Sequence, residues 1–150
     1  MAKIKMISAG EHYTAATIGK LDGLGEYLYS LPSGMEIPGK VFIGEALQCT
    51  GTEVSFQLMP PGGGIDFLHT HRQNEELYIV LKGNGEYQVD GEIFPVGEGG
   101  IVRVSAPGKR SWRNTGKEPV IMLVIQSKSG SLSQLEGADG VLVEEPPRWE

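Results

Sequence analysis

Two histidines one residue apart open the stretch HTHRQNEELYIVLKG, residues 69 to 83. If this stretch begins as a strand, His69 and His71 point to the same side, with their imidazoles about 7 Å apart along the chain. Glu76 opens the next apolar run after a polar turn, so its carboxylate can return opposite the pair. Two neutral imidazoles and one carboxylate form a ligand set suited to Fe(II), Mn(II), Ni(II) or Zn(II), with positions left for water or substrate.

The same pattern has a plainer interpretation, in which two histidines in a polar loop face the solvent. An H-x-H pair without support is a weak motif. The metal interpretation is favoured because the chain has three histidines and two of them are here. A glycine-rich break also precedes the pair, and the carboxylate follows at a distance that suits a returning strand. The third histidine, His12, is far from any motif, and we expect it at the surface.

Short apolar runs separated by turn residues indicate which elements must position these side chains. The 22 glycines and 9 prolines are scattered between the runs, which favours many short strands over long helices. Asp90-Gly91 predicts a hairpin turn. The spacing of about 8–12 residues between strands indicates a sandwich or a barrel. The predicted strands are 41–49, 52–60, 65–71, 75–83, 85–96 around that turn, 99–106, 111–114 and 119–128.

Two of these runs, EELYIVLKG (75–83) and PVIMLVIQ (119–126), are apolar at successive positions. A strand with apolar residues on both faces is covered on both sides, so we expect both runs to be central in a sheet. Outside the strands, residues 26–40 predict short strands or turns, and 131–137 predict a short helical turn. The tail 143–150 has the composition of an arm.

The spacing of the histidine stretch resembles the first motif of the cupin superfamily, G-x5-H-x-H-x(3,4)-E-x6-G. Gly63, His69, His71, Glu76 and Gly83 match it at every defined position. The resemblance implies an all-β fold, the cupin-type β-jelly roll or double-stranded β-helix barrel, with His69, His71 and Glu76 as metal ligands.

This resemblance covers about 41–128 and implies one domain over 1–150. The N-terminal extension would be 1–40 and the C-terminal tail 129–150, both irregular. The neighbouring Glu75 is one residue too far from Gly83 to match the motif, and its side chain would face the other way.

The second cupin motif, which resembles G-x5-P-x-G-x2-H-x3-N, is not matched in full by residues 104 to 116. Asn114 aligns with the final asparagine, and counting back places Arg110 where the family carries a further metal-binding histidine. Alternation along a strand puts Arg110, Trp112 and Asn114 on one face. Because arginine is a permanent cation that cannot bind a metal, at most three protein ligands remain.

Arg110 therefore has two interpretations, which the sequence leaves open. In the first, Arg110 binds an anionic substrate, since a guanidinium can grip a carboxylate with two hydrogen bonds. Trp112 would then wall the pocket, and the Tyr78 hydroxyl could donate to the substrate or fill the core. In the second, Arg110 fills the space of the missing ligand and pairs with Glu75, Glu76 or Asp66.

Composition excludes several classes of partner. The net charge of -6 and a pI near 5.1 argue against nucleic acid, which needs a basic surface. No run approaches the roughly 18 apolar residues of a membrane helix, and the N-terminus lacks the apolar core of a signal peptide. The single Cys49 excludes an internal disulfide, and we expect it to be buried. These features predict a soluble cytoplasmic protein with a small-molecule ligand. The resemblance to small cupins adds a homodimer.

Two functional hypotheses follow. In the first, a divalent metal (Fe, Mn, Ni or Zn) held by His69, His71 and Glu76 acts on a small polar or anionic molecule. The reaction would be that of an oxidoreductase, an isomerase or a lyase of cupin type. In the second, the protein is a non-catalytic module that binds a sugar or a carboxylate, with weak metal binding or none.

Overall fold

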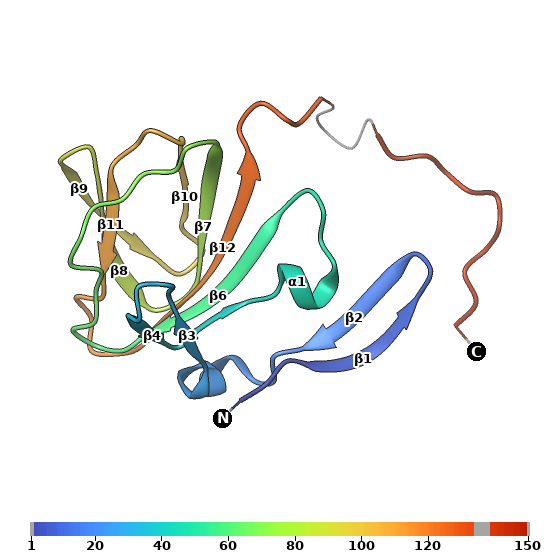
Figure 1. Cartoon of the computed structure of the whole chain (residues 1–150), viewed down its shortest axis with the longest axis horizontal. Coiled ribbons are helices and arrows are strands. Elements are labelled where there is room, and N and C mark those ends of the chain that lie inside the picture. Colours follow the sequence, from blue (N-terminus) through green and yellow to red (C-terminus); the bar gives the residue numbers. More distant parts are fainter. Residues whose placement is uncertain (1, 134–138, 150) are drawn as a thin grey trace.

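The central part of the chain forms two antiparallel β-sheets that face each other (Figure 1). The computed structural model describes residues 2–133 and 139–149. The strands of the larger sheet are β5 (Lys40–Phe42), β6 (Glu53–Met59), β7 (Asn74–Lys82), β10 (Ile101–Val104) and β12 (Val120–Lys128). The strands of the smaller sheet are β8 (Asn84–Val89), β9 (Glu92–Gly97) and β11 (Arg110–Arg113). The spatial orders are β10-β7-β12-β6-β5 and β11-β8-β9.

The two facing surfaces enclose the main hydrophobic core. Side chains on β7 alternate strictly, so that Glu76, Tyr78 and Val80 are buried while their neighbours are partly exposed. Tyr78 packs against Tyr87 of β8 and Trp112 of β11, with ring centroids 5.2 and 6.2 Å away. The aromatic side chains of the smaller sheet thus pack against Tyr78, next to Glu76 on the inner face of β7.

A second core covers the outer face of the larger sheet. Ile121 of β12 is 1% exposed and packs with Val41 of β5 and with Leu24 and Tyr27 from the N-terminal region. The larger sheet therefore has a buried residue set on each face. The prediction that 75–83 and 119–126 form central strands is confirmed. On the outer face Ile121 of β12 is buried, whereas the outer-face residues of β7 are partly exposed.

The N-terminal region, expected to be irregular, contains two hairpins. Its elements are β1 (Lys5–Gly10), β2 (Tyr13–Thr17), the 3₁₀ helix η1 (Leu21–Glu26), β3 (Leu28–Ser30) and β4 (Glu36–Pro38). Leu24 of η1 is fully buried and anchors this region to the larger sheet. The β1–β2 hairpin extends away from the two sheets (Figure 1).

The C-terminal region after β12 has no helix or strand in 129–133 and 139–149. Most of the helical turn predicted over 131–137 lies outside the described residues. No helix among the residues that the structure describes has the length and apolar character needed to cross a membrane.

The hairpin turn at Asp90-Gly91 is confirmed. It joins β8 to β9, and the φ angles of Asp90 and Gly91 are 50° and 92°. Positive φ at both central residues is the signature of a type I′ turn, whose twist matches that of the flanking strands.

The predicted strand 41–49 is wrong in its second half. The strand ends at Phe42, and the chain turns into a short helix, α1 (Gly44–Leu47). The backbone N–H of Gly44 donates to the Glu53 carboxylate at 3.0 Å, which pulls the chain out of the sheet. Cys49 follows this helix and is exposed, so the prediction that it is buried is also wrong.

The predicted strand 65–71 is wrong as well, because this segment is an irregular crossing between β6 and β7. Two isolated bridges connect this part of the chain to β11 of the smaller sheet: His69 pairs with Arg110, and Gly64, just before the segment, pairs with Arg113. A Cβ on Gly64 would lie 3.0 Å from the Cβ of Arg113, so the close approach of the two backbones favours glycine here.

Candidate metal centre

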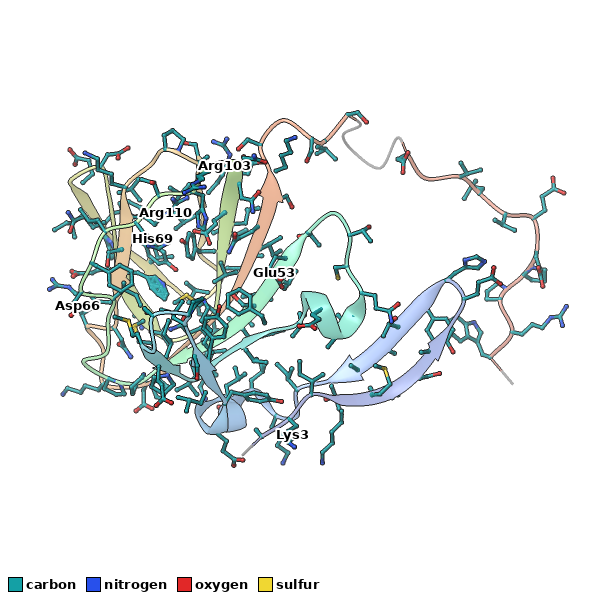
Figure 2. All side chains as sticks on the ribbon, viewed as in Figure 1. Lys3, Glu53, Asp66, His69, Arg103 and Arg110 are labelled. Atoms are coloured by element: carbon teal, nitrogen blue, oxygen red, sulfur yellow. The ribbon has the colours of Figure 1, made fainter. Side chains whose placement is uncertain are left out.

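Backbone hydrogen bonds fix the two histidines although their segment is not a regular strand. The N–H of His69 donates to the Arg110 carbonyl at 3.2 Å, and the N–H of Arg110 donates back at 3.1 Å. The N–H of His71 donates to the Ala106 carbonyl at 2.9 Å. The segment is therefore tied to β11 and to the turn before it. Figure 2 shows His69 and Arg110 close together at this end of the barrel.

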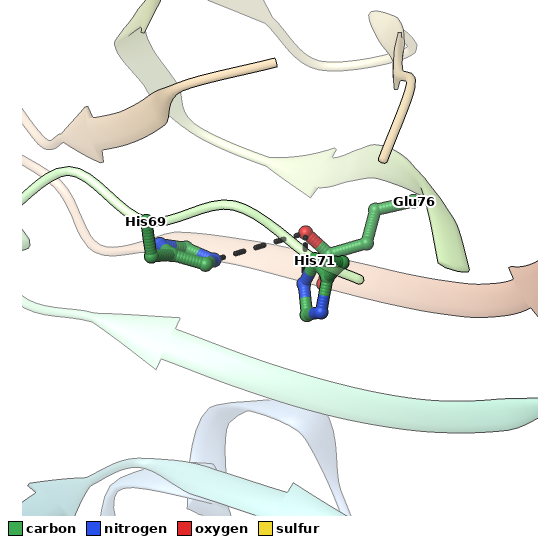
Figure 3. Close-up of side chains that lie close together, drawn as sticks. All are labelled: His69, His71 and Glu76. Carbon is green, nitrogen blue, oxygen red and sulfur yellow. Dashed lines mark ion pairs between the residues drawn. The ribbon is translucent and has the colours of Figure 1, made fainter. Parts of the chain in front are cut away.

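The side chains of His69, His71 and Glu76 converge (Figure 3). Nε2 of His71 lies 3.2 Å from Oε2 of Glu76, and Nε2 of His69 lies 3.9 Å from the same oxygen. One donor atom from each of the three residues lies within 4.8 Å of the others. The side chains of His69 and His71 are 37% and 24% exposed, whereas that of Glu76 is 5% exposed. The carboxylate is thus on the inside and the imidazoles are on the open side.

The donor set fits a divalent transition metal. A metal bound at about 2.0–2.1 Å separates adjacent ligand atoms by about 3.0–3.4 Å, and the His71–Glu76 distance is within that range. Nδ1 of His69 and Nε2 of His71 are buried and have no hydrogen-bond partner among the described residues. A buried polar atom without a partner costs free energy, and coordination of a cation by Nε2 of His71 would relieve that cost for His71. In His69 the nitrogen that faces Glu76 is Nε2, so coordination on that side would not relieve the cost for its Nδ1.

The neutral form of His69, which is the form that binds a metal, is favoured by its surroundings. Burial lowers the pKa of His69, and the Glu76 carboxylate opposes this shift. The positive charges of Arg110 and Lys40, together with His71, lower the pKa of His69 further. The imidazole of His69 is consequently available as a lone-pair donor near neutral pH.

Arg110 is the most buried charged side chain of the site, with a relative exposure of 1%. Its Nε lies 3.4 Å from Oε2 of Glu76. The two terminal nitrogens donate to the carbonyls of Ser105 and Ala106 at 3.2 and 3.4 Å. Of the three carboxylates considered as partners from the sequence, Glu76 is the one that forms the ion pair.

Glu75 lies outside the site, as the alternation of β7 predicts. Its carboxylate accepts a hydrogen bond from Nε of Arg103 at 2.7 Å on the outer surface. Glu75 and Glu76 are therefore adjacent in sequence but face opposite sides of the sheet.

Tyr78 contacts the donor set directly, whereas Trp112 packs against Tyr78. The hydroxyl of Tyr78 donates to Oε2 of Glu76, the oxygen that the histidines and Arg110 also face. Burial raises the pKa of Tyr78, and the charge of Glu76 raises it further. Trp112 is 9% exposed and packs in the core against Tyr78.

Lys40 and Gln57 also belong to this interior. Nζ of Lys40 donates to Oε1 of Gln57 at 3.5 Å and lies 5.0 Å from the centroid of the Phe42 ring. Burial lowers the pKa of Lys40, and the charge of Glu76 partly offsets this shift. The predicted strand begins at residue 41, so the sequence pattern leaves Lys40 in a turn. Alternation with Phe42 is the signal that places Lys40 on the inner face.

Two hollows border this end of the barrel. One of about 210 Å³ is lined by residues that include Gln57, Met59 and Phe67. The ring of Phe67 lies 6.2 Å from that of His69, but none of the three donors lines this hollow. The other, of about 300 Å³, is also lined by Phe67, together with Trp112, and again by none of the three donors.

Comparisons with known proteins agree with this architecture. Residues 55–126 match the family model described as the cupin domain. A crystal structure of a cupin protein from Bacteroides fragilis has 38% sequence identity and a TM-score of 0.66, and the match covers 69% of this chain and 88% of that one. A predicted oxalate decarboxylase from Thermotoga maritima has a TM-score of 0.57 over 68% of this chain and 90% of its own, with 23% identity, and so shares the fold.

A curated relative, 5-nitrosalicylic acid 1,2-dioxygenase from a Bradyrhizobium species, is 34% identical over 70 residues. That match covers 46% of this chain and 32% of the dioxygenase, so the chain spans about a third of that enzyme's length. The identity to the Bacteroides protein over most of its length, the matched domain model and the two-sheet barrel agree. The chain belongs to the cupin superfamily.

Proposed function

We propose that this cupin binds a divalent transition metal through His69, His71 and Glu76 and acts on a small anionic molecule at the same place. The observation that carries the proposal is the convergence of two imidazoles on one buried carboxylate oxygen. Nε2 of His71, which faces that oxygen, is buried and has no hydrogen-bond partner among the described residues, and this supports the proposal. A bound metal would supply Lewis acidity or a site for oxygen chemistry.

The charges around the donor set favour an anion. Glu76 contributes one negative charge, while Arg110 and Lys40 each contribute a positive one close to it. Unit charges 4 Å apart interact by about 4 kcal/mol at the effective dielectric constant near 20 that suits proteins. A dication beside two more cations is therefore unfavourable unless an anion offsets it, and the substrate is the natural source of that anion.

Arg110 acts in this proposal mainly through its charge. Its Nε faces Glu76, and its terminal nitrogens donate to the Ser105 and Ala106 carbonyls. A guanidinium has five N–H groups, so one remains on each terminal nitrogen for a ligand. These contacts hold the charge in one place, which is the condition for orienting an anionic substrate.

The reaction class that we propose is oxidoreductase, with isomerase and lyase as the other cupin-type choices. The similarity over 70 residues to a dioxygenase of a nitrosalicylic acid supports this order. Salicylic acids carry a carboxyl group, in agreement with an anionic substrate. The residues that would meet such a substrate are Arg110 and Tyr78, with Trp112 supporting them from the core.

A second candidate function is metal-free binding of a sugar or a carboxylate. It is favoured by the Arg110–Glu76 ion pair and by the hydrogen bond from Tyr78, which already satisfy the carboxylate that a metal would use. In this alternative the guanidinium supplies the positive charge that a metal ion would otherwise bring.

Titration with Mn²⁺ separates the two functions. We expect the wild-type protein to bind one ion, Glu76→Gln to bind it at least tenfold more weakly, and Glu75→Gln to match the wild type. Glu75 is the matched control because it is adjacent but faces outward. Equal affinities for the two variants would contradict the metal site. Carboxylate binding without any metal would favour the second function.

A further inference from the structure

Lys40 brings a second cation to the inner face of the larger sheet. In the β5–β6 register Lys40 lies opposite Gln57, and Phe42 lies opposite Ser55. Gln57 and Ser55 are 3% and 1% exposed and belong to the interior. Because paired residues point to the same face of a sheet, Lys40 and Phe42 also face the interior.

The ammonium group of Lys40 forms no ion pair with a carboxylate of residues 2–133 or 139–149. Among the residues that the structure describes, its one hydrogen-bond acceptor is the neutral Oε1 of Gln57, at 3.5 Å. Two other basic side chains of the barrel do have carboxylate partners: Arg110 pairs with Glu76, and Lys82 pairs with Asp22 at 3.0 Å. A partly buried cation without a counter-ion is unfavourable, so its retention points to an anion that comes from outside the chain.

We propose that Lys40 is a second anion anchor and that the ligand is a small dianion, such as a dicarboxylate. One anionic group would lie at the donor set near Arg110, and the other would pair with Lys40. The inference rests on the proposed function in that it requires an anion at the donor set. Beyond the proposed function, the site selects a ligand with two negative charges, and Lys40 is the residue that selects the second charge.

The charges of the site agree with a dianion when a metal is bound. A dication with Arg110 and Lys40 leaves three positive charges after Glu76 is counted. A monoanion would leave two of these uncompensated, and a dianion leaves one. Burial lowers the pKa of Lys40 although the Glu76 carboxylate opposes the shift, as expected for an ammonium that lacks a close counter-ion.

A hollow that Gln57 lines is of a size for a small ligand. It has a volume of about 210 Å³ and is lined in part by Gln57, the acceptor of the Lys40 ammonium, whereas Lys40 and Arg110 themselves do not line it. Pockets for drug-sized ligands are typically about 300–1,000 Å³, so this hollow favours a molecule with few carbon atoms. Gln57 and Met59 both line this hollow, and the Gln57 amide can donate to a carboxylate.

Calorimetric binding of malonate and of acetate to metal-reconstituted protein tests the inference. We expect the wild type to bind malonate at least tenfold more tightly than acetate. Lys40→Met should lose at least tenfold in malonate affinity while acetate binding changes less than twofold. Lys40→Arg should retain the preference in part. Lys82→Met is the matched control, since it removes a lysine charge outside the site, and it should behave as the wild type.

Unchanged malonate affinity in Lys40→Met would overturn the inference, as would equal losses for the two anions or a wild type that binds neither. If thermal melting shows that Lys40→Met is unfolded, Lys40→Gln replaces it, with the same expected affinities. Metal content measured on the same samples distinguishes the two proposals. A metal-free wild type contradicts the proposed metal site, while the comparison of malonate with acetate in the variants still decides the role of Lys40.

Discussion

Arg110 and Glu76 form an ion pair inside the barrel, with Nε of the guanidinium 3.4 Å from Oε2 of the carboxylate and side chains only 1% and 5% exposed. The same oxygen faces His69 and His71. The one buried carboxylate of the site is therefore shared between a permanent cation and the two potential metal ligands. Variants that remove Arg110 can show whether the Glu76 carboxylate mainly compensates the guanidinium or a bound metal ion.

Removal of the guanidinium should make stability depend on metal. In the presence of a chelator we expect Arg110→Met to lose about 3–5 kcal/mol of unfolding free energy, because Glu76 is left buried and unpaired. Added Mn²⁺ should restore most of this loss, since the ion provides a new counter-charge. Urea unfolding with and without metal measures both quantities.

The control for that experiment is Arg103→Met. Arg103 pairs with Glu75 on the surface, where its side chain is 61% exposed. Exposed pairs contribute about 0–1 kcal/mol, so this variant should be close to the wild type under both conditions. If Arg110→Met were no less stable than Arg103→Met, the buried pair would not have the importance that its geometry implies.

Replacement of Arg110 by histidine should tighten metal binding. The substitution removes a cation that opposes the metal and adds a nitrogen donor at the position where the second cupin motif carries one. We expect Arg110→His to bind Mn²⁺ or Zn²⁺ at least tenfold more tightly than the wild type in a competition titration. An unchanged affinity would mean that this position does not reach the ion.

Two buried tyrosines should resist deprotonation. Burial raises the pKa of Tyr78 and of Tyr87 well above the ordinary value of about 10. Because the folded state keeps these protons and the unfolded state loses them, their contribution to stability is present below about pH 10 and is lost as the pH rises further. Tyrosinate absorbance should therefore show two groups that ionise only when the protein unfolds.

The variants Tyr78→Phe and Tyr87→Phe should each lower by one the number of tyrosines that ionise only when the protein unfolds. A single titration of all tyrosines near pH 10, in protein that circular dichroism shows to be folded, would argue against the buried positions of these rings.

The last glycine of the first cupin motif should be required for steric reasons. Gly83 has a φ of 83°, and a Cβ there would lie 2.5 Å from the Pro119 carbonyl oxygen. We expect Gly83→Ala to lose about 1–3 kcal/mol or more of unfolding free energy through backbone strain and this clash. Gly91 has a φ of 92° but open space around its Cβ position, so Gly91→Ala measures the backbone cost alone. Equal losses of unfolding free energy in Gly83→Ala and Gly91→Ala would show that the structure relieves the clash between the new Cβ and the Pro119 carbonyl.

The central strands could be predicted almost to the residue from apolar patterning. The runs 75–83 and 119–128 correspond to β7 (Asn74–Lys82) and β12 (Val120–Lys128), because strands covered on both faces have a strong and continuous apolar signal. The segments predicted wrongly, 43–49 and 65–71, are shaped by tertiary contacts such as the Glu53 carboxylate on Gly44, which local sequence does not reveal.

The donor set could be predicted from motif spacing, and the alternation of β7 distinguished Glu76 from Glu75. The role of Lys40 could not, because it depends on β5 pairing with β6, and the two strands are separated by the α1 turn. For Arg110 the sequence left several acidic partners open. Only the packing of β11 against β7 brings its guanidinium to Glu76.

The central claim is that His69 and His71 hold a metal, and elemental analysis after reconstitution and removal of free ions tests it most directly. We predict about one equivalent of a divalent transition metal in the wild type and in His12→Ala, whose exposed histidine lies outside the site. We predict less than about a tenth of an equivalent in the double variant His69→Ala/His71→Ala. A wild type with as little metal as the double variant would contradict the account.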